Sequence, residues 1–515
     1  MAASSSISHM LIPSPKTHQP ISFRSKLNPT PPPSLPQNQK STKLIVHSKS
    51  SLSMSPTTTT SELHREQQHQ QEPAVVMHQT TYHKSEEQQQ LSDVWREIHG
   101  ENEWAGLLDP MDKTLRQELI RYGEMAQACY DAFDFDPFSK YCGSCRFTRG
   151  NFFNSLGMSD HGYTVTRYLY ATANIDLPKF FKQSRWPKMW SKHANWAGYV
   201  AVSDDATSRR LGRRDITVAW RGTVTYLEWV VDLMDFLIPI SSQSIPCPDQ
   251  TVKVESGFLE LYTDKEQDCS YSKYSAREQV LSEVKRLMEI YHDEELSITI
   301  TGHSLGSALA ILSAYDIAET GLNMKRDNSI VPVSVMSFSG PRVGNARFKE
   351  RLEMLGVKVL RVVNVHDLVP KTPGFLFNEH RPLAVMKIAE ALPWSYSHVG
   401  EELVLDHKNS PFLKPDADAV CAHNLEVLLH LIDGYHGKGQ RFILSTGRDP
   451  ALVNKACDCL KDHYLVPPHW RQDENKGMIR GNDGRWVQPE RPKLDDHPED
   501  MLHHLRQLGL TSSDI

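Results

Sequence analysis

The amino-acid sequence predicts an α/β fold, in which helices cover both faces of a mostly parallel central sheet and a helical extension precedes it. Two observations support this prediction. Apolar residues recur at roughly helical spacing over residues 91–135, and from about residue 197 strand-like stretches alternate with helical ones. Such alternation is typical of a parallel sheet whose strands are connected by helices.

The elements are expected in a regular order. The helical region at 91–135 is interrupted at Pro110, where a helix cannot continue undisturbed. The elements after it are a strand at 199–202, a strand at 216–220, a helix at 276–290, a strand at 296–301, a helix at 305–319, a strand at 331–338, a helix at 346–355, a strand at 357–363, a strand at 399–405 and a helix at 424–435.

The start of the chain has a composition of its own. Residues 1–61 contain six bases and no acid, amid abundant Ser, Thr and Pro, and the first acid is Glu62. Such a segment cannot bury a core, and acid-poor, Ser-rich leaders are typical of organelle transit peptides. Because Arg24 is its only arginine, a plastid is favoured over a mitochondrion. We therefore expect residues 1–60 to be a chloroplast transit peptide, and the mature protein to carry 63 acids against 51 bases.

The remaining chain is expected to contain one large domain with polar flanks. Residues 61–90 are rich in Gln, His and Glu, and their histidines lack a repeat or cysteine partners, which favours a polar linker over a metal-binding tract. Residues 91–475 form the expected domain, including the N-terminal helices, and residues 476–515 form a C-terminal tail.

Composition excludes several classes of protein. The net charge of −6 argues against nucleic acid as the main partner. No run of eighteen apolar residues occurs, so a transmembrane segment is not predicted. Of the eight cysteines, only Cys142 and Cys145 have CxxC spacing, and a packed or solvent-facing thiol pair is favoured over a metal or redox site. The chain does not resemble a disulfide-stapled secreted protein.

One GxSxG motif occurs, at residues 302–306, with Ser304 as its serine. It follows the expected strand at 296–301 and opens the expected helix at 305–319. This is the sharp turn that pushes a nucleophilic serine out above a sheet. Side chains at the glycine positions would collide with the neighbouring strand and helix, and the amide of Leu305 would point at a developing oxyanion. The alternative, a Gly-rich turn without chemistry, does not account for this context.

A serine hydroxyl needs a histidine to accept its proton, and an acid that holds this histidine in the useful tautomer. In this kind of fold the chain order is serine, acid, histidine. Asp367 follows the expected strand at 357–363, in a loop on the same edge of the sheet as Ser304. An Asp before an apolar residue and a proline also suits a turn, but position and order predict that Asp367 is the acid.

Several histidines lie downstream of the serine, and chemistry alone leaves two candidates. His366 abuts Asp367 and would have trouble turning back on it. His398 opens an expected strand and also suits a buried structural position, whereas His423 directly precedes an expected helix. The residues by themselves therefore favour His423 over His398 without excluding either.

Five spaced motifs resemble those of the class 3 lipases, and more narrowly those of the plant plastid phospholipase A1 group. The resemblance runs from about residue 90 to about residue 475 and implies the α/β-hydrolase fold. The motifs are Ala-Trp-Arg-Gly-Thr at 219–223, Gly-His-Ser-Leu-Gly at 302–306, Ser-Gly-Pro-Arg-Val-Gly-Asn at 339–345, His-Asn-Leu-Glu at 423–426 and Leu-His-Leu at 429–431.

The resemblance also implies roles for particular residues. His423 would be the catalytic histidine and His398 a structural one. Thr223 would join Leu305 in supplying the backbone amides of an oxyanion hole. Relatives usually have glycine where this chain has Ser307, and a small side chain should be tolerated in the first turn of a helix.

These residues predict a serine acyl hydrolase. Ser304 would attack an ester carbonyl, His423 would take its proton, and Asp367 would steady the imidazolium before water cleaves the acyl-enzyme. No metal or organic cofactor is needed. The resemblance implies release of fatty acid from the sn-1 position of phospholipids or galactolipids, with products that would feed oxylipin and jasmonate synthesis. The alternatives are a triacylglycerol lipase or carboxylesterase with the same triad, and a lipase-like binding protein without activity.

The expected partners are glycerolipids at a membrane or lipid-droplet surface, because a long acyl chain needs an apolar landing surface. Residues 226–238 carry bulky apolar side chains and suit either a core helix or a lid. Residues 373–377 are a second candidate for peripheral membrane contact. Arg221 suits a clamp for a substrate phosphate or, preferably, a buried structural arginine.

Overall fold

The computed structural model describes residues 84–134, 143–172, 195–223, 236–267, 272–373, 395–470, 479–480 and 486–487. The chain divides into two units, residues 1–78 and 79–515, and all described residues belong to the second. The expected transit peptide and most of the expected C-terminal tail lie outside the described residues.

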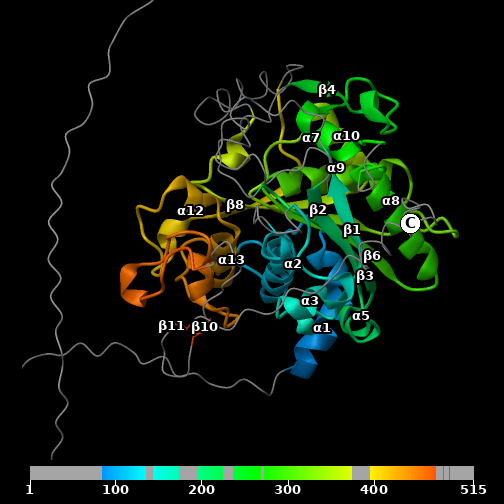
Figure 1. The fold of residues 1–515 in the computed structure, drawn as a ribbon. Helices are drawn as coiled ribbons and strands as arrows, with labels where there is room; N and C mark the ends of the chain where they lie inside the picture. The colour runs from blue at the N-terminus through cyan, green and yellow to red at the C-terminus, as the bar shows by residue number, and fades with distance from the viewer. Residues whose placement is uncertain are drawn as a thin grey trace, which may run out of the picture. The chain divides into compact units, whose positions relative to one another are not determined.

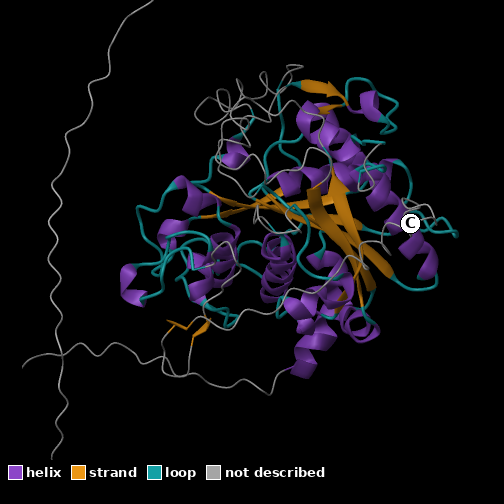
Figure 2. Ribbon diagram, viewed as in Figure 1, coloured by secondary structure: helices purple, strands orange, loops and turns teal. Residues whose placement is uncertain are grey.

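Within the described residues, a seven-stranded sheet has the order β1-β2-β3-β6-β7-β8-β9 (Figure 1, Figure 2). The pairs from β3 to β9 are parallel, whereas β1 and β2, and β2 and β3, pair antiparallel. The predicted α/β fold with a mostly parallel sheet is therefore confirmed. The strands are β1 (Tyr163–Ala171), β2 (Asn195–Ser203), β3 (Arg214–Trp220), β6 (Leu296–His303), β7 (Val333–Phe338), β8 (Lys358–Asn364) and β9 (Glu401–Leu405), beside the short pairs β4 (Leu237–Pro239) with β5 (Lys253–Glu255) and β10 (Ile479–Arg480) with β11 (Trp486–Val487).

Helices cover both faces of the sheet, as Figure 1 shows. Along β2, Tyr199 and Ala201 contribute to the apolar cluster under α2 and α13, whereas Val200 and Val202 contribute to the cluster under α8 and α9. Alternate residues of a strand face opposite sides, so both faces of the sheet carry apolar residues. The helices are α1 (Lys84–Ile98), α2 (Lys113–Ala132), α3 (Phe152–Ser155), α5 (Asp205–Leu211), α7 (Ser256–Thr263), α8 (Ala276–Ile290), α9 (Leu305–Glu319), α10 (Ala346–Met354), α12 (Ala419–His423) and α13 (Leu425–Gly434).

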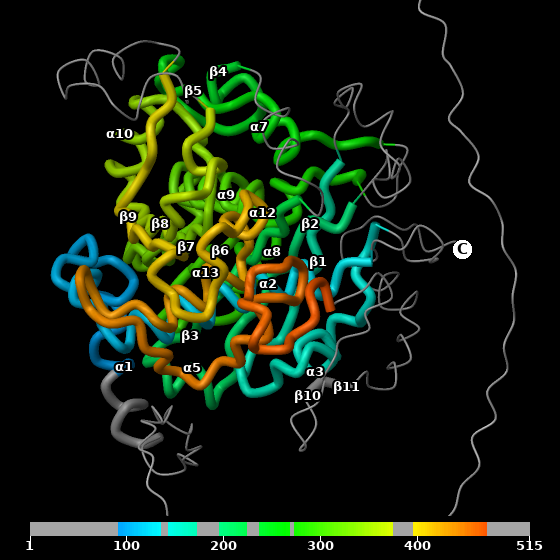
Figure 3. Tube along the Cα trace, turned by 90° about the vertical axis from the view of Figure 1, so that its left-hand side faces the viewer, coloured from blue at the N-terminus to red at the C-terminus, as the bar shows by residue number. Residues whose placement is uncertain are grey.

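The N-terminal helices are part of the core. Helix α2 contacts α13 and the sheet, and the two helices lie side by side (Figure 3). Its first turn is capped by Asp112, whose carboxylate accepts the Leu115 N–H at 2.8 Å. Helix α1 begins within the segment predicted as a linker, because Lys, Glu and Gln are good helix formers that extend the helix carrying buried Trp95.

A buried polar network lies at the N-terminal ends of the parallel strands, around Asp215 of β3. The Asp215 carboxylate is fully buried and accepts hydrogen bonds from five hydroxyl groups at 2.7–2.9 Å. The hydroxyl donors are Tyr122, Tyr163, Thr217, Ser297 and Thr299. Because burial of a charge without partners is costly, these donors make the carboxylate tolerable in the core.

Local sequence signals predicted several bounds closely. The helices expected at 276–290 and 305–319 are α8 and α9. Helix α8 starts with a capping box formed by Ser275 and Glu278, a signal that is local by nature. Strand β1 was not predicted, and no described helix is long and apolar enough to span a bilayer.

Candidate active site

Ser304 occupies the turn between β6 and α9. Its backbone has φ 58° and ψ −127°, a conformation that residues with a Cβ rarely adopt and that marks a strained turn. The Ser304 N–H donates to the Phe338 carbonyl oxygen at the end of β7, at 2.9 Å. The serine is therefore held at the C-terminal ends of the parallel strands, as the motif predicts.

Three glycines allow this turn to form. A Cβ on Gly302 would lie 2.3 Å from the Gly306 oxygen, and one on Gly306 would lie 2.4 Å from the Trp220 oxygen. A Cβ on Gly222 would lie 2.4 Å from the backbone oxygen of the residue before Ser304. The neighbours are backbone atoms of the sheet and helix, which cannot give way as a flexible side chain would.

Ser304, His423 and Asp367 lie within hydrogen-bonding distance, although 119 and 56 residues separate the contacting pairs. His423 Nε2 lies 2.9 Å from Ser304 Oγ, and His423 Nδ1 lies 2.7 Å from Asp367 Oδ2. A carboxylate only accepts hydrogen bonds, so Nδ1 carries the proton and Nε2 offers its lone pair to the hydroxyl. This tautomer is the one that can take a proton from serine.

The Asp367 side chain is fully buried in the loop after β8. Its Oδ1 accepts the Val369 N–H at 2.9 Å, and its own N–H donates to the Asn364 oxygen at 2.9 Å. One carboxylate oxygen is thereby fixed by the backbone, and the other faces His423.

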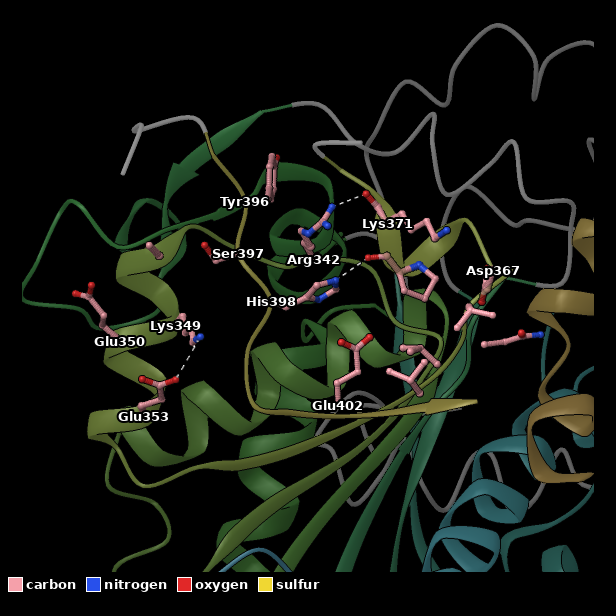
Figure 4. Close-up of a pocket in the computed structure, with 16 residues that line it drawn as sticks. Arg342, Lys349, Glu350, Glu353, Asp367, Lys371, Tyr396, Ser397, His398 and Glu402 are labelled. Carbon is pink, nitrogen blue, oxygen red and sulfur yellow. Dashed lines mark hydrogen bonds and ion pairs between the residues drawn. The ribbon is translucent and has the colours of Figure 1, made fainter. Parts of the chain in front are cut away.

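Arg342 and His398 hold the loop that follows Asp367 (Figure 4). Arg342 donates to the Lys371 carbonyl oxygen, and His398 Nε2 donates to the Pro370 carbonyl oxygen at 2.7 Å. Burial and the neighbouring arginines hold the pKa of His398 well below its usual range, so the ring is neutral. Of the two candidate histidines, His398 supports the acid loop and His423 contacts the serine.

A pocket of about 760 Å³ adjoins the same loop (Figure 4). Asp367 is among its lining residues, whereas Ser304 and His423 are not, so the pocket meets the three-residue cluster only at its acid. Its charged lining residues are Arg342, Lys349, Glu350, Glu353, Asp367, Lys371 and Glu402.

The segment that carries His423 is anchored on both sides. The carbonyl oxygen of Ala422 accepts the Asn364 Nδ2–H at 3.1 Å. Asn424 caps α13 by accepting the Glu426 N–H at 2.9 Å. Asn364 thus joins the acid loop to the histidine segment, a role that the prediction missed because it appears in sequence as an ordinary strand-end residue.

A disulfide joins Cys421, which lies two residues before His423, to Cys459. The sequence does not predict it, because a separation of 38 residues carries no pairing signal. Cys145 is buried and Cys142 lies outside the described residues, so the expected thiol pair stays a prediction.

The two residues expected to supply oxyanion amides are Leu305, which directly follows Ser304 in the sequence, and Thr223, which directly follows Gly222. Leu305 is the first residue of α9, where backbone N–H groups have no partner within the helix. Thr223 follows Gly222, on which a Cβ would lie 3.3 Å from Ser304 Cβ. The assignment of these two amides to an oxyanion hole stays a prediction.

Arg221 has a structural role. Its Nε donates to the Trp196 oxygen at 2.9 Å and its Nη1 to the Gly222 oxygen at 3.0 Å, and its guanidinium lies 3.9 Å from the centre of the Phe133 ring. Burial lowers the pKa of Arg221 to about 10. These contacts support the buried arginine over the phosphate clamp.

Ser307, the departure from the family pattern, is fully buried. Its hydroxyl donates to the Gly302 oxygen at 2.6 Å and accepts the Phe338 N–H at 3.1 Å. The side chain links α9 to the ends of β6 and β7, so the fold accommodates it.

The two segments proposed for lipid contact lie largely outside the described residues, which include only 236–238 of the first and Pro373 of the second. Phe236, in the described part of the first segment, is 56% exposed, and Leu368, which follows Asp367, is 48% exposed.

Fold and geometry together define the class. A mostly parallel sheet with a strained serine turn between β6 and α9, and a histidine and an acid beyond the later strands, is the α/β-hydrolase arrangement.

Comparisons with known proteins narrow the class. The family model "Lipase (class 3)" matches residues 217–377. Phospholipase A1-Igamma1, chloroplastic, from Arabidopsis thaliana is 68% identical over 431 residues, which are 81% of this chain and 84% of the relative. Phospholipase A1-II 6 from Oryza sativa subsp. japonica is 42% identical over 79% of this chain and 97% of its own length. A lipase crystal structure from Rhizopus microsporus var. chinensis has 20% identity and a TM-score of 0.36, over 59% of this chain and 78% of that chain.

The chain belongs to the class 3 lipases, within the group of plant plastid phospholipases A1, and it is a lipid ester hydrolase. The predicted chloroplast destination is confirmed by the relatives, three of which are named chloroplastic.

Proposed function

We propose that this lipase is a phospholipase A1 that uses Ser304 to release fatty acid from the sn-1 position of glycerolipids. One observation carries the proposal: hydrogen-bond distances of 2.9 and 2.7 Å connect the Ser304 hydroxyl through His423 to the buried Asp367 carboxylate. The phospholipase A1 names of the relatives support the choice of substrate class.

In the proposed mechanism, Ser304 Oγ attacks the ester carbonyl and its proton passes to His423 Nε2. The Asp367 carboxylate stabilises the imidazolium by accepting the hydrogen bond from His423 Nδ1–H. The amides of Thr223 and Leu305 donate hydrogen bonds to the oxyanion. The imidazolium then protonates the departing lysolipid alkoxide. A water molecule, deprotonated by the histidine, cleaves the acyl-enzyme and releases the fatty acid.

We propose peripheral contact with a membrane or lipid-droplet surface. Exposed Leu368 directly follows Asp367, and exposed Phe236 lies within the segment 226–238. Apolar groups at these places would receive an acyl chain as it leaves the lipid layer. The released fatty acids would enter oxylipin and jasmonate synthesis.

The proposed organisation of the chain assigns residues 1–60 to a transit peptide, 61–90 to a linker, 91–475 to the catalytic domain and 476–515 to a tail. Helix α1 begins at Lys84, inside the segment proposed as a linker. N-terminal sequencing of the protein recovered from plastids tests the first boundary, since the mature chain should start near residue 60.

The central test is Ser304→Ala in the purified mature protein. Loss of the nucleophile should lower kcat on phosphatidylcholine vesicles by about 10³-fold or more. Ser313→Ala is the matched control, since Ser313 is a buried serine of α9, the helix that follows Ser304, and this variant should keep its activity. Substantial turnover by Ser304→Ala would refute the mechanism.

A substrate panel separates the alternatives. Phospholipid and galactolipid should be hydrolysed faster than triacylglycerol or a short-chain ester, with the sn-1 chain released first. Preference for triacylglycerol would support the triacylglycerol lipase instead. Inertness towards a fluorophosphonate probe would support a binding protein that has kept the fold.

A further inference from the structure

His303, the residue before the nucleophile, contacts the backbone of His423. Its Nε2 lies 2.8 Å from the His423 carbonyl oxygen, and its Nδ1 lies 2.7 Å from the Tyr130 hydroxyl oxygen. A carbonyl oxygen only accepts, so Nε2 carries the proton and donates. The unprotonated Nδ1 must then accept the Tyr130 O–H. Both nitrogens of this ring are therefore fully used.

The ring at 303 is also electrically neutral. Burial, followed by the proximity of His423, holds the pKa of His303 well below its usual range. The two imidazoles are tilted, with ring centres 4.6 Å apart. A charged His303 would oppose the positive charge that His423 gains during catalysis, because like charges this close repel strongly. A neutral ring supplies a hydrogen-bond donor without that repulsion.

The hydroxyl of Tyr130 also contacts the loop that is proposed to supply the oxyanion hole. The backbone of Gly222 forms a hydrogen bond with the Tyr130 hydroxyl. The two groups are so close that a Cβ on Gly222 would lie 2.2 Å from the Tyr130 hydroxyl oxygen. Gly222 directly precedes Thr223 in the oxyanion loop. Tyr130 itself lies in α2, outside the residues 217–377 that match the lipase family model.

We propose that Tyr130 and His303 form a positioning bridge that sets the place of His423 relative to Ser304 and the oxyanion loop. The inference rests on the proposed function, since it takes His423 as the catalytic base. Neither bridge residue touches the reacting atoms: His303 acts through the backbone of His423, and Tyr130 acts through the His303 ring. Through Tyr130, the N-terminal helix α2 would help to position the residues of the active site.

The need for such a bridge follows from where His423 stands. It is the last residue of α12, a helix of five residues, which is too short to be rigid by itself. A displacement of about 1 Å at a catalytic group lowers a rate by about a hundredfold. Asn364 holds the carbonyl oxygen of residue 422 and His303 holds that of residue 423, so two successive peptide groups are anchored.

Tyr130→Phe tests the bridge, because it removes only the hydroxyl. We expect kcat on phosphatidylcholine to fall about tenfold, with KM and Tm unchanged, because His303 and Gly222 lose their shared partner. Tyr199→Phe is the matched control: it removes a buried tyrosine hydroxyl that donates to the oxygen of Met125, a residue of the same helix as Tyr130, at 2.9 Å. Its kcat should stay within about twofold of the parent.

Two variants of His303 sharpen the test. Gln places an N–H near the position of Nε2, so His303→Gln should retain most of the parent kcat. His303→Leu lacks the donor and should lower kcat by about a hundredfold. The rate of inactivation by a soluble fluorophosphonate should fall by the same factors, since it reports on Ser304 and His423 without a lipid surface. In a bridge the effects are not additive, so adding Tyr130→Phe to His303→Leu should lower kcat no further.

The bridge is refuted if Tyr130→Phe matches Tyr199→Phe, or if the double variant shows the product of the two single effects. His303→Gln and Tyr130→Phe carry the test if His303→Leu does not fold. Ser304→Ala, assayed alongside, separates the two proposals. An active Ser304→Ala overturns the proposed function, whereas an inactive one together with an unaffected Tyr130→Phe overturns only the bridge.

Discussion

The two ends of the parallel strands use an aspartate in opposite ways. At the N-terminal ends, Asp215 accepts five hydroxyl hydrogen bonds, and both of its oxygens are occupied by groups that stay in place. At the C-terminal ends, Asp367 is equally buried, but one of its oxygens faces an imidazole. Burial alone therefore does not distinguish a structural carboxylate from the proposed catalytic one. The chemistry of the partners does.

The histidines beside these aspartates differ in the same way. His99 accepts from Arg213 Nη2 at 2.7 Å and contacts Ser334 Oγ at 2.9 Å, so both nitrogens are satisfied by fixed groups. His423 instead offers Nε2 to Ser304, whose proton would leave in the proposed mechanism when the hydroxyl attacks a carbonyl. A site becomes reactive where one partner in a satisfied network is able to change its bonding.

The largest effect in this comparison is expected on kcat, when Asp367 is changed. Asp367→Asn would offer an amide N–H to His423 and favour the wrong tautomer, and kcat should fall by about 10³- to 10⁴-fold. Thermal unfolding should shift by only a few degrees. Asp406→Asn, which alters a partly exposed acid paired with His366, is the matched control and should change kcat little. A loss of less than tenfold in Asp367→Asn would remove the distinction drawn between the two aspartates.

Asp215→Asn should have the converse result. The amide of Asn cannot accept hydrogen bonds from five hydroxyl groups, and buried Arg213 would lose a counter-charge. The free energy of unfolding should therefore drop by about 3–5 kcal/mol. Urea denaturation measures this drop. Active-site titration with a fluorophosphonate should show that the molecules still folded keep the parent kcat. A stable variant with impaired kcat would mean that the network serves catalysis directly.

The smallest expected effect concerns pH. Burial, together with Arg213, lowers the pKa of His99 from its ordinary 6.5 to about 4. The unfolded chain therefore binds more protons between these values, so the stability contributed by neutral His99 is complete above pH 6.5 and is lost as the pH falls towards 4. The loss should reach about 3 kcal/mol across this window. Unfolding by urea at several pH values measures it.

His99→Gln should reduce this pH dependence, because Gln does not titrate. Other buried histidines contribute with the same sign, among them His430, whose pKa burial lowers to about 3. The comparison is therefore between variant and parent. His292→Gln, at an exposed position, should leave the parent dependence intact. Equal slopes in the parent and His99→Gln would show that His99 is not held neutral.

Local patterns were sufficient for much of the fold. The helices at 276–290 and 305–319 were predicted because each is an uninterrupted run of helix-compatible residues: α8 buries one stripe, and α9 buries every residue from Leu305 to Ile317. The GxSxG turn was predicted because its glycines are demanded by neighbours within the motif and the adjoining strand. Strand β1 was missed, since it pairs antiparallel at the edge of the sheet, outside the alternating strand and helix pattern.

The sequence by itself determined the α/β class, the serine turn and the place of Asp367 after its strand, because these depend on residues close together along the chain. Chemistry alone favoured His423 over His398 without excluding either, and the resemblance to lipases assigned the catalytic role to His423. The tertiary structure decided which imidazole contacts Ser304, and it alone brought Tyr130 to His303 and Cys421 to Cys459. These contacts join segments up to 173 residues apart, and no local spacing records where separate elements meet on the two faces of a sheet.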